Sequence, residues 1–146
     1  MTALAALLVA LAVGAGQPAT PPLGAMRARL APVPLDVAMQ ETIAGLGTAT
    51  ATLSGSTLTV EGTYRGLVSP ATAVKVFDSP RPGMRGRLVG EFASGGGTTG
   101  TFKGTVTLTR EQAAAYAAGL LYVQLHSEKA ADGNLWGWLT TPKGRR

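Results

Sequence analysis

The sequence predicts an all-β fold, an antiparallel β-sandwich with one short helix near residues 110–118. Three observations lead to this class. Apolar and polar residues alternate in many short runs, turns rich in glycine and proline separate those runs, and a single stretch carries the start and stop signals of a helix. A chain of 146 residues is long enough to bury the core of one such domain.

The first two predicted strands form a β-hairpin. Residues 47–53, GTATATL, alternate threonine with alanine or leucine, so that the threonines share one face. Residues 57–64, TLTVEGTY, alternate in the same way. The Ser-Gly-Ser sequence at 54–56 is a turn signal between them. This pattern is typical of a hairpin with one apolar and one polar face.

Further alternating runs complete the predicted sheet. They are residues 72–78, 86–92, 99–108, 120–126 and 134–140. The segment SPRPGMRG, residues 79–86, holds two prolines and two glycines and is therefore expected to be a loop. Gly104 lies inside one of the runs, where a glycine predicts a β-bulge.

One helix is expected between Thr109 and Gly119. Thr109 is a suitable N-cap, and Gln112 follows three residues later, which is the spacing of a capping box. Alanines and Tyr116 come next, and Gly119 lies where a glycine commonly ends a helix. The helix should therefore be short, about two to three turns.

The N-terminal residues predict export. Residues 3–15 form an uncharged apolar run of signal-peptide length, too short to span a membrane. A buried N-terminal helix is the alternative, which the Gly- and Pro-rich residues that follow disfavour. We expect a secreted or periplasmic protein associated with the cell envelope, without a transmembrane span once the signal peptide is removed. The expected divisions are a signal peptide at 1–19, a flexible linker at 20–25, the folded domain at 26–140 and a basic tail at 141–146.

Composition limits the chemistry that a site could use. The chain has no cysteine, which excludes a disulfide framework, thiolate metal ligands and a cysteine nucleophile. Thirteen Lys and Arg against eight Asp and Glu give a net charge of +5. Basic residues cluster at Arg81, Arg85 and Arg87, and again in the C-terminal tail. They are candidates for binding an anionic envelope polymer or lipid head groups, or they are ordinary solubilising charge. Nucleic acid is not expected as a partner.

Three segments together resemble the CHRD (chordin-type) domain family. They are GTATATLSGSTLTVEGTYRGLVSPATAV at 47–74, GTFKGTVTLTREQAAAYAAGLLYVQLHS at 100–127 and GNLWGWL at 133–139. Their order and spacing carry the resemblance, which extends over about residues 45–139. It implies an exported, Greek-key-like β-sandwich of superoxide-dismutase-like or immunoglobulin-like topology, in a family whose biochemical role is poorly defined.

The chain departs from the family pattern where the family carries histidines. The His-Ile-His of the family is replaced by Lys-Val-Phe at 75–77, and its Glu-Ile-Arg-Gly by Asn-Leu-Trp-Gly at 134–137. The third histidine is kept as His126. The family pattern implies a plausible metal geometry, but two of its three imidazoles are missing here. His126 is therefore only a weak metal candidate, and no cofactor is expected.

Alternation places both tryptophans away from the aliphatic face of their strand. Leu135 and Leu139 form the apolar row, and Trp136 and Trp138 take the opposite positions. With neighbouring strands in the family register, this face would be an aromatic-basic surface made of Lys75, Phe77, Tyr122, His126, Trp136 and Trp138. Sizeable exposed aromatic surfaces usually mark contact sites. The alternative is that a loop, the helix or the tail covers the rings.

These observations favour a non-catalytic binding or adhesion module. We expect it to contact a protein or polysaccharide of the envelope through the aromatic-basic face, or to self-associate through it. The alternative is a copper- or zinc-binding, dismutase-like domain that has lost most of its ligands. No catalytic residue is expected, because His126 and the adjacent Ser127 point to opposite faces of a strand. The glycines at 95–97 lead into no helix and make no phosphate loop.

Overall fold

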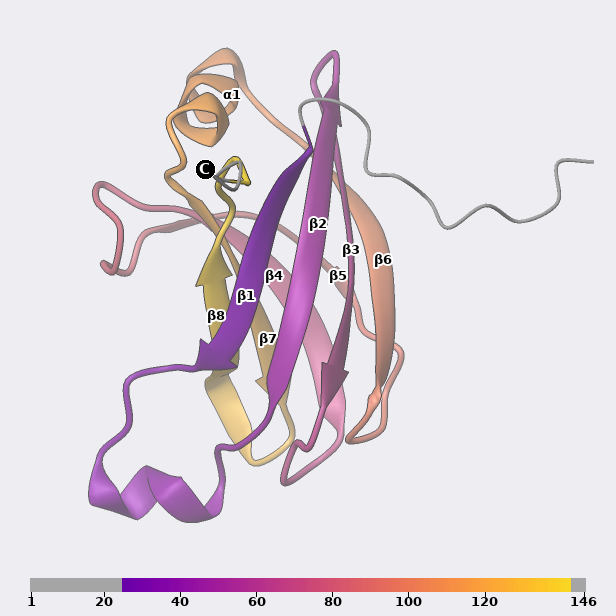
Figure 1. Cartoon of the computed structure of the whole chain (residues 1–146), viewed down its shortest axis with the longest axis vertical. Coiled ribbons are helices and arrows are strands. Elements are labelled where there is room, and N and C mark those ends of the chain that lie inside the picture. Colours follow the sequence, from indigo (N-terminus) through magenta and orange to yellow (C-terminus); the bar gives the residue numbers. More distant parts are fainter. Residues whose placement is uncertain (1–24, 143–146) are drawn as a thin grey trace, which may run out of the picture.

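The computed structural model describes residues 25–142, shown in Figure 1. Within that range the chain forms eight strands, one α-helix and one short 3₁₀ helix. The strands are β1 (Met26–Pro32), β2 (Leu46–Ser54), β3 (Thr57–Arg65), β4 (Ala71–Asp78), β5 (Arg87–Ala93), β6 (Gly100–Thr107), β7 (Leu121–Ser127) and β8 (Ala130–Trp138). The helices are η1 (Val37–Glu41) and α1 (Arg110–Ala117). The predicted signal peptide, all of the linker except Ala25, and the last four residues of the basic tail lie outside the described residues.

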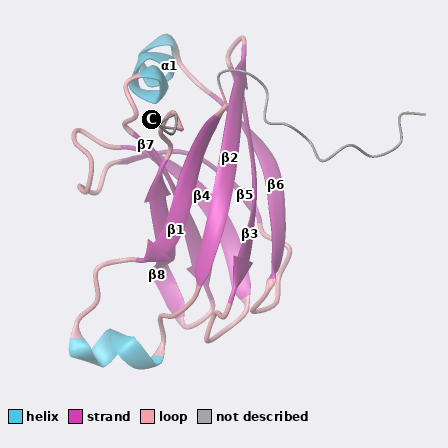
Figure 2. Ribbon diagram, viewed as in Figure 1, coloured by secondary structure: helices cyan, strands magenta, loops and turns pink. Residues whose placement is uncertain are grey.

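All the strands belong to one antiparallel sheet, in the order β5-β4-β7-β8-β1-β2-β3-β6. β1 joins the two halves of this sheet, because its first residues pair with β2 and its last two, Ala31 and Pro32, pair with β8. Figures 1 and 2 show the halves as two layers, with β1, β2, β3 and β6 in front of β4, β5, β7 and β8. β5 and β6, the two end strands of the sheet, contact each other although they are not hydrogen-bonded neighbours. The sheet therefore forms a nearly closed barrel. The predicted all-β class with one short helix is confirmed.

The chain crosses between the layers twice between β3 and β6. β3 lies beside β6 rather than beside β4, and β4 lies beside β7. Such pairing of strands that are not consecutive is the Greek-key arrangement. Each layer therefore combines strands that are not all consecutive in the chain.

The core lies between the two layers and consists of the apolar positions that alternate along each strand. Its fully buried members include Leu58, Val60, Val74, Val76, Leu121, Val123, Leu125, Leu135 and Leu139. Burying one such side chain stabilises the fold by about 1.5–3 kcal/mol relative to leaving it in water. The small residues Ala49 and Ala51 face the same core from β2.

Helix α1 begins and ends as the sequence predicts. The Thr109 hydroxyl accepts a hydrogen bond from the amide of Gln112 (3.2 Å), and the side chain of Gln112 accepts one from the amide of Thr109 (2.9 Å), which completes the capping box. Gly119 follows the helix with a φ of +75°, a conformation that favours glycine. Tyr116 anchors the helix on the core, with its hydroxyl donating to the carbonyl of Ala51 at 3.1 Å.

The predicted bulge at Gly104 is wrong. β6 pairs with β3 in one unbroken register, and Phe102 and Val106 both point into the core. The glycine is needed for a different reason, because the ring of Phe92 from β5 lies against it. A Cβ atom at position 104 would be 2.2 Å from Cγ of Phe92. Gly104 therefore permits close packing where β5 meets β6.

β1 was not predicted from the sequence. The segment MRARLAP does carry the signal of a strand, since Met26, Ala28 and Leu30 are buried and alternate with exposed Arg27 and Arg29. β1 thus brings two arginines to the outer face of the front layer. No helix within residues 25–142 is long and apolar enough to cross a membrane.

Candidate functional site: an aromatic cluster beside an arginine loop

Strand pairing in the back layer brings together four aromatic residues. Tyr122 of β7 lies opposite Phe77 of β4 on one side and opposite Trp138 of β8 on the other. Trp136 is two residues from Trp138 and lies opposite Gln124. Residues two apart on a strand share a face, so all four rings lie on the outer face of this layer. We call Phe77, Tyr122, Trp136 and Trp138 the aromatic cluster.

The rings of the aromatic cluster are in direct contact. Tyr122 stacks on Phe77 with ring centroids 5.0 Å apart, and its centroid lies 4.7 Å from that of Trp138 and 5.7 Å from that of Trp136. The two indoles meet edge to face, with centroids 4.7 Å apart and planes at 70°. Each such pair contributes about 0.5–1.5 kcal/mol beyond burial, so the arrangement is well held.

The cluster is covered in part. Tyr122 is only 1% exposed, whereas Phe77, Trp136 and Trp138 each keep part of their surface in solvent. Trp136 packs against a small second core of three buried residues, against which the partly buried Met39 also packs. This second core lies mainly in the β1–β2 connection. Its three buried residues are Val33, Ile43 and Ala130. Trp136 is thus braced by the second core, and both indoles are partly exposed, although Nε1 of Trp138 is buried without a hydrogen-bond partner among the described residues.

The loop between β4 and β5, residues 79–86, rests on this cluster, and we call it the arginine loop. The amide of Gly86 donates to the hydroxyl of Tyr122 at 3.0 Å. The buried Ser79 holds the loop closed, since its hydroxyl donates to the carbonyl of Met84 at 2.8 Å. The side chains of Arg81 and Arg85 are exposed. The two sites predicted separately from the sequence, aromatic and basic, are therefore neighbours.

Two further cations flank the cluster, and each has an acidic neighbour. Arg87, at the start of β5, lies 3.8 Å from a carboxylate oxygen of Asp78. Lys75 lies two residues before Phe77 on β4, and its ammonium group is 3.9 Å from a carboxylate oxygen of Glu91. Both are loose ion pairs at the surface, which contribute little to stability and leave the cations available to a ligand.

His126 is separated from the aromatic cluster, although it lies on the same strand face. Four residues, or about 13 Å of extended strand, separate it from Tyr122. Its ring is 5% exposed, and Nδ1 is 2.8 Å from the carbonyl oxygen of Ala131. Because a carbonyl only accepts, Nδ1 carries the proton. Nε2 is buried without a hydrogen-bond partner among the described residues.

Burial lowers the pKa of His126 below its usual value. The hydrogen bond to Ala131 opposes this effect, and the nearby charge of Lys75 adds to it. The imidazole is therefore neutral at pH 7. Its enclosure makes it a poor candidate for a general base that must reach a substrate.

The residues present do not fit a copper or zinc site. Within residues 25–142 there is no group of three or more His, Cys, Asp or Glu side chains placed to hold a metal ion. His126 lies opposite Ala73 on β4, and the positions where the family pattern has histidines hold Lys75 and Phe77. An ammonium group and a phenyl ring supply no metal ligand at neutral pH.

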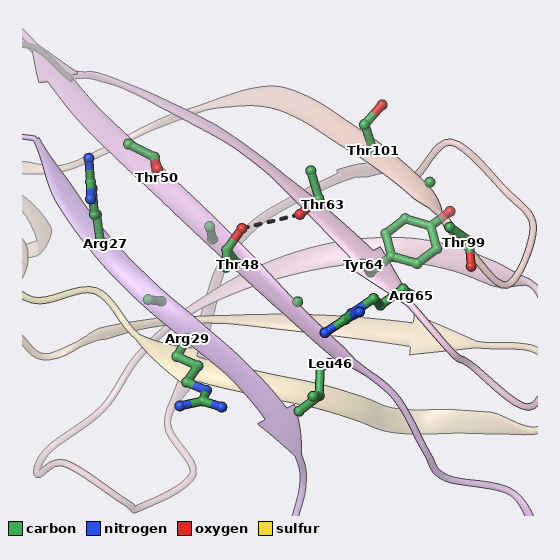
Figure 3. Close-up of a pocket in the computed structure, with 14 residues that line it drawn as sticks. Arg27, Arg29, Leu46, Thr48, Thr50, Thr63, Tyr64, Arg65, Thr99 and Thr101 are labelled. Atoms are coloured by element: carbon green, nitrogen blue, oxygen red, sulfur yellow. Dashed lines mark hydrogen bonds between the residues drawn. The ribbon is translucent and has the colours of Figure 1, made fainter. Parts of the chain in front are cut away.

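The structure also reveals a surface that the sequence did not indicate. A groove of about 890 Å³ crosses the outer face of the front layer, and Figure 3 shows the side chains that line it. Its cations are Arg27 and Arg29 from β1 and Arg65 from β3. They do not form a cluster in the sequence, and only the pairing of β1, β2 and β3 brings them to one face.

Comparison with known proteins confirms the resemblance. The model of the CHRD domain family matches residues 28–139, which is most of the chain. No curated protein and no solved structure shows significant similarity to it. CHRD domains are typically extracellular, and the family is in general non-enzymatic. The chain belongs to the CHRD domain family.

Proposed function

We propose that this CHRD domain is an exported, non-catalytic binding module that holds a glycan or a protein partner of the cell envelope on its aromatic cluster and arginine loop. One observation carries the proposal. Two partly exposed indoles lie 4.7 Å apart, and the loop bearing Arg81 and Arg85 is hydrogen-bonded to the tyrosine beneath them.

The chemistry of this surface suits a ligand with both apolar and anionic parts. The exposed parts of Trp136 and Trp138 offer apolar ring surface for contact with a sugar ring or an aliphatic side chain. The guanidinium groups of Arg81 and Arg85 can pair with a carboxylate or phosphate on the same ligand. Aromatic residues and arginine are also the residue types most enriched at the centres of binding interfaces.

The rigidity of the site supports binding rather than simple packing. Trp136 is braced by the second core around Val33 and Ile43, and Tyr122 is fixed by Phe77 and Gly86. Side chains held in place before binding lose little entropy when a ligand arrives. A fully buried cluster would offer no surface to a ligand, whereas both indoles are partly exposed.

The test is a screen of envelope polysaccharides and extracts from the source cell, with tryptophan emission and retention on immobilised ligand as readouts. We expect a ligand to shift the emission of the wild-type protein. Trp136→Ser/Trp138→Ser should lower retention at least about tenfold. Val68→Ser is the matched control. Val68 is a 40% exposed apolar residue that precedes the start of β4, whereas Phe77 of the aromatic cluster lies near the end of that strand.

A second variant protects the test against loss of folding, since Trp136 supports the second core. Arg81→Gln/Arg85→Gln changes only exposed side chains and should also weaken retention. Retention that both variants leave unchanged would refute the proposal. If the ligand is a second copy of the chain, light scattering should show a dimer in the wild type and a monomer in Trp138→Ser.

A further inference from the structure

The groove lies on the outer face of the front layer, and its β1 edge, with Arg27 and Arg29, runs beside β8, the strand that carries the two tryptophans. Its floor is β2, with β1 on one side and β3 and β6 on the other. Figure 3 shows Arg65 reaching from β3 toward β2, and Arg27 and Arg29 on the far side of β2. Neighbouring strands are about 4.8 Å apart and alternate residues about 7 Å apart, so the backbones of Arg27 and Arg29 are roughly 7 Å apart and that of Arg65 lies roughly 12 Å from Arg29 and roughly 17 Å from Arg27. They bracket an elongated concave surface.

The charge of this groove is uncompensated. All eight Asp and Glu residues of the chain lie within residues 25–142. No carboxylate lies within 4.0 Å of Arg27, Arg29 or Arg65 in that range, and none lines the groove. Glu61 is the only acidic residue on the outer face of these four strands, and it lies 3.9 Å from the ammonium group of Lys103. The three guanidinium groups of the groove therefore have no acidic partner among residues 25–142.

Threonine hydroxyls line the floor between the arginines. Thr48 lies opposite Thr63, and Thr63 lies opposite Thr101, so the three form a row across the sheet. The hydroxyls of Thr48 and Thr63 are 3.2 Å apart, which leaves further donor and acceptor capacity on both. Each threonine also offers a methyl group. Such a surface can exchange hydrogen bonds with sugar hydroxyls and contact sugar C–H groups.

We propose that this groove binds an acidic polysaccharide, with Arg27, Arg29 and Arg65 pairing with its carboxylate or sulfate groups. Charge complementarity and the hydroxyl floor select this class. A single-stranded nucleic acid would need exposed aromatic rings for stacking, but the one aromatic residue of the groove, Tyr64, is buried. A membrane surface would need protruding apolar side chains, and Leu46 is the only large apolar residue exposed there.

The experiment is calorimetric titration of the full chain with polygalacturonate, heparin and neutral dextran at low and at physiological salt. We expect binding to one of the two acidic polymers, salt sensitivity, and no binding to dextran. Arg29→Gln/Arg65→Gln should weaken binding about tenfold or more. Arg110→Gln/Lys129→Gln removes the same charge from exposed positions outside the groove and should change binding less than about twofold.

A second pair of variants tests the groove floor without removing an arginine. Thr48→Glu places a carboxylate between the arginines and should abolish binding, whereas Thr105→Glu, exposed on β6 outside the groove, should have a small effect. Equal losses in the groove and control variants would overturn the inference, as would no binding to either acidic polymer. Tighter binding to single-stranded DNA or to anionic vesicles would also overturn it.

This inference and the proposed function can fail separately. Neither indole lines the groove, so Trp138→Ser should bind the polysaccharide as well as the wild type. Because Arg29 lies beside Gly137, between the two tryptophans of β8, the variants and not the tryptophan emission separate the two sites. Binding that is lost in Trp138→Ser but kept in Arg29→Gln/Arg65→Gln would assign the polysaccharide to the aromatic cluster and refute the groove site.

Discussion

The amide of Gly86 donates a hydrogen bond of 3.0 Å to the hydroxyl of Tyr122 and thereby ties the arginine loop to the aromatic cluster. Tyr122 itself is buried, so it does not meet a ligand directly. Its ring supports Phe77 and both tryptophans, and its hydroxyl sets the position of the loop. One side chain thus organises both parts of the proposed binding surface.

Tyr122→Phe should loosen the arginine loop. The substitution keeps the ring contacts but removes the acceptor of the Gly86 amide, which should cost about 0.5–1.5 kcal/mol in the free energy of unfolding. Limited trypsin digestion should show faster cleavage after Arg85, whereas the bond after Arg81 is protected by Pro82. Tyr116→Phe removes a hydrogen bond elsewhere and is the control. Cleavage after Arg85 at the wild-type rate in Tyr122→Phe would mean that the hydrogen bond does not hold the loop.

The protein should lose stability in mild acid because of His126. Burial lowers the pKa of His126 in the folded state, so the unfolded chain takes up a proton first as the pH falls below about 6.5. The free energy of unfolding should fall by at most about 1.4 kcal/mol per pH unit. It should stop falling once the pH is below the folded-state pKa of His126. At pH values above the unfolded-state pKa, the contribution of His126 to the free energy of unfolding no longer changes with pH.

Urea unfolding at a series of pH values from about 7.5 to about 5 measures this effect. His126→Asn is the matched variant, since its amide can still donate to the carbonyl of Ala131 but cannot titrate. Its stability should be nearly flat over the same range. An equal slope in both proteins would assign the acid sensitivity to other groups.

Gly104→Ala should destabilise the protein because of the packing between β5 and β6. The added methyl group would overlap the ring of Phe92, at an expected cost of about 1–3 kcal/mol. Phe92→Ala removes the atoms that would overlap, so it should cost less in the Gly104→Ala background than in the wild type, which a double-mutant cycle by urea unfolding would reveal. Thr105→Ala, at the exposed neighbouring position, should be nearly neutral. Additive effects of the two substitutions would mean that the residues do not clash.

The two indoles should be coupled spectroscopically. Their centroids are 4.7 Å apart with planes at 70°, a geometry that gives an exciton couplet in far-ultraviolet circular dichroism. Trp136→Phe and Trp138→Phe should each abolish the couplet while the fold survives. Acrylamide should quench the wild-type emission to an intermediate degree, because both rings are partly exposed. A couplet that persists in either variant would contradict the observed arrangement.

Much of the fold follows from local patterns in the sequence. The hairpin of β2 and β3 and the capped helix α1 lie where their residue types predict them, because alternation, turns and caps depend on residues close together in the chain. β1 was missed although MRARLAP alternates in the same way and has Pro22 and Gly24 before it and Pro34 after it. The signal was present but short.

Contacts between distant residues were harder to predict. Gly104 suggested a bulge, but the glycine is needed because the ring of Phe92 packs against it. Phe92 belongs to β5, which lies in the other layer. Arg27, Arg29 and Arg65 gave no sign of a shared site in the sequence, because two of them lie on β1, which was not predicted, and the third lies more than thirty residues further on.

The sequence alone was enough to determine the all-β class, the capped helix, the CHRD family and the placement of both tryptophans on the outer face of their strand. These follow from the period of two along a strand and from the order of short motifs. Only the folded structure determined three further features. They are the extent to which Trp136 is covered, the contact of the arginine loop with Tyr122, and the position of three arginines in one groove. The physical reason is that exposure and charge compensation are set by neighbours from other strands, and the layers bring those neighbours together only when the chain has folded.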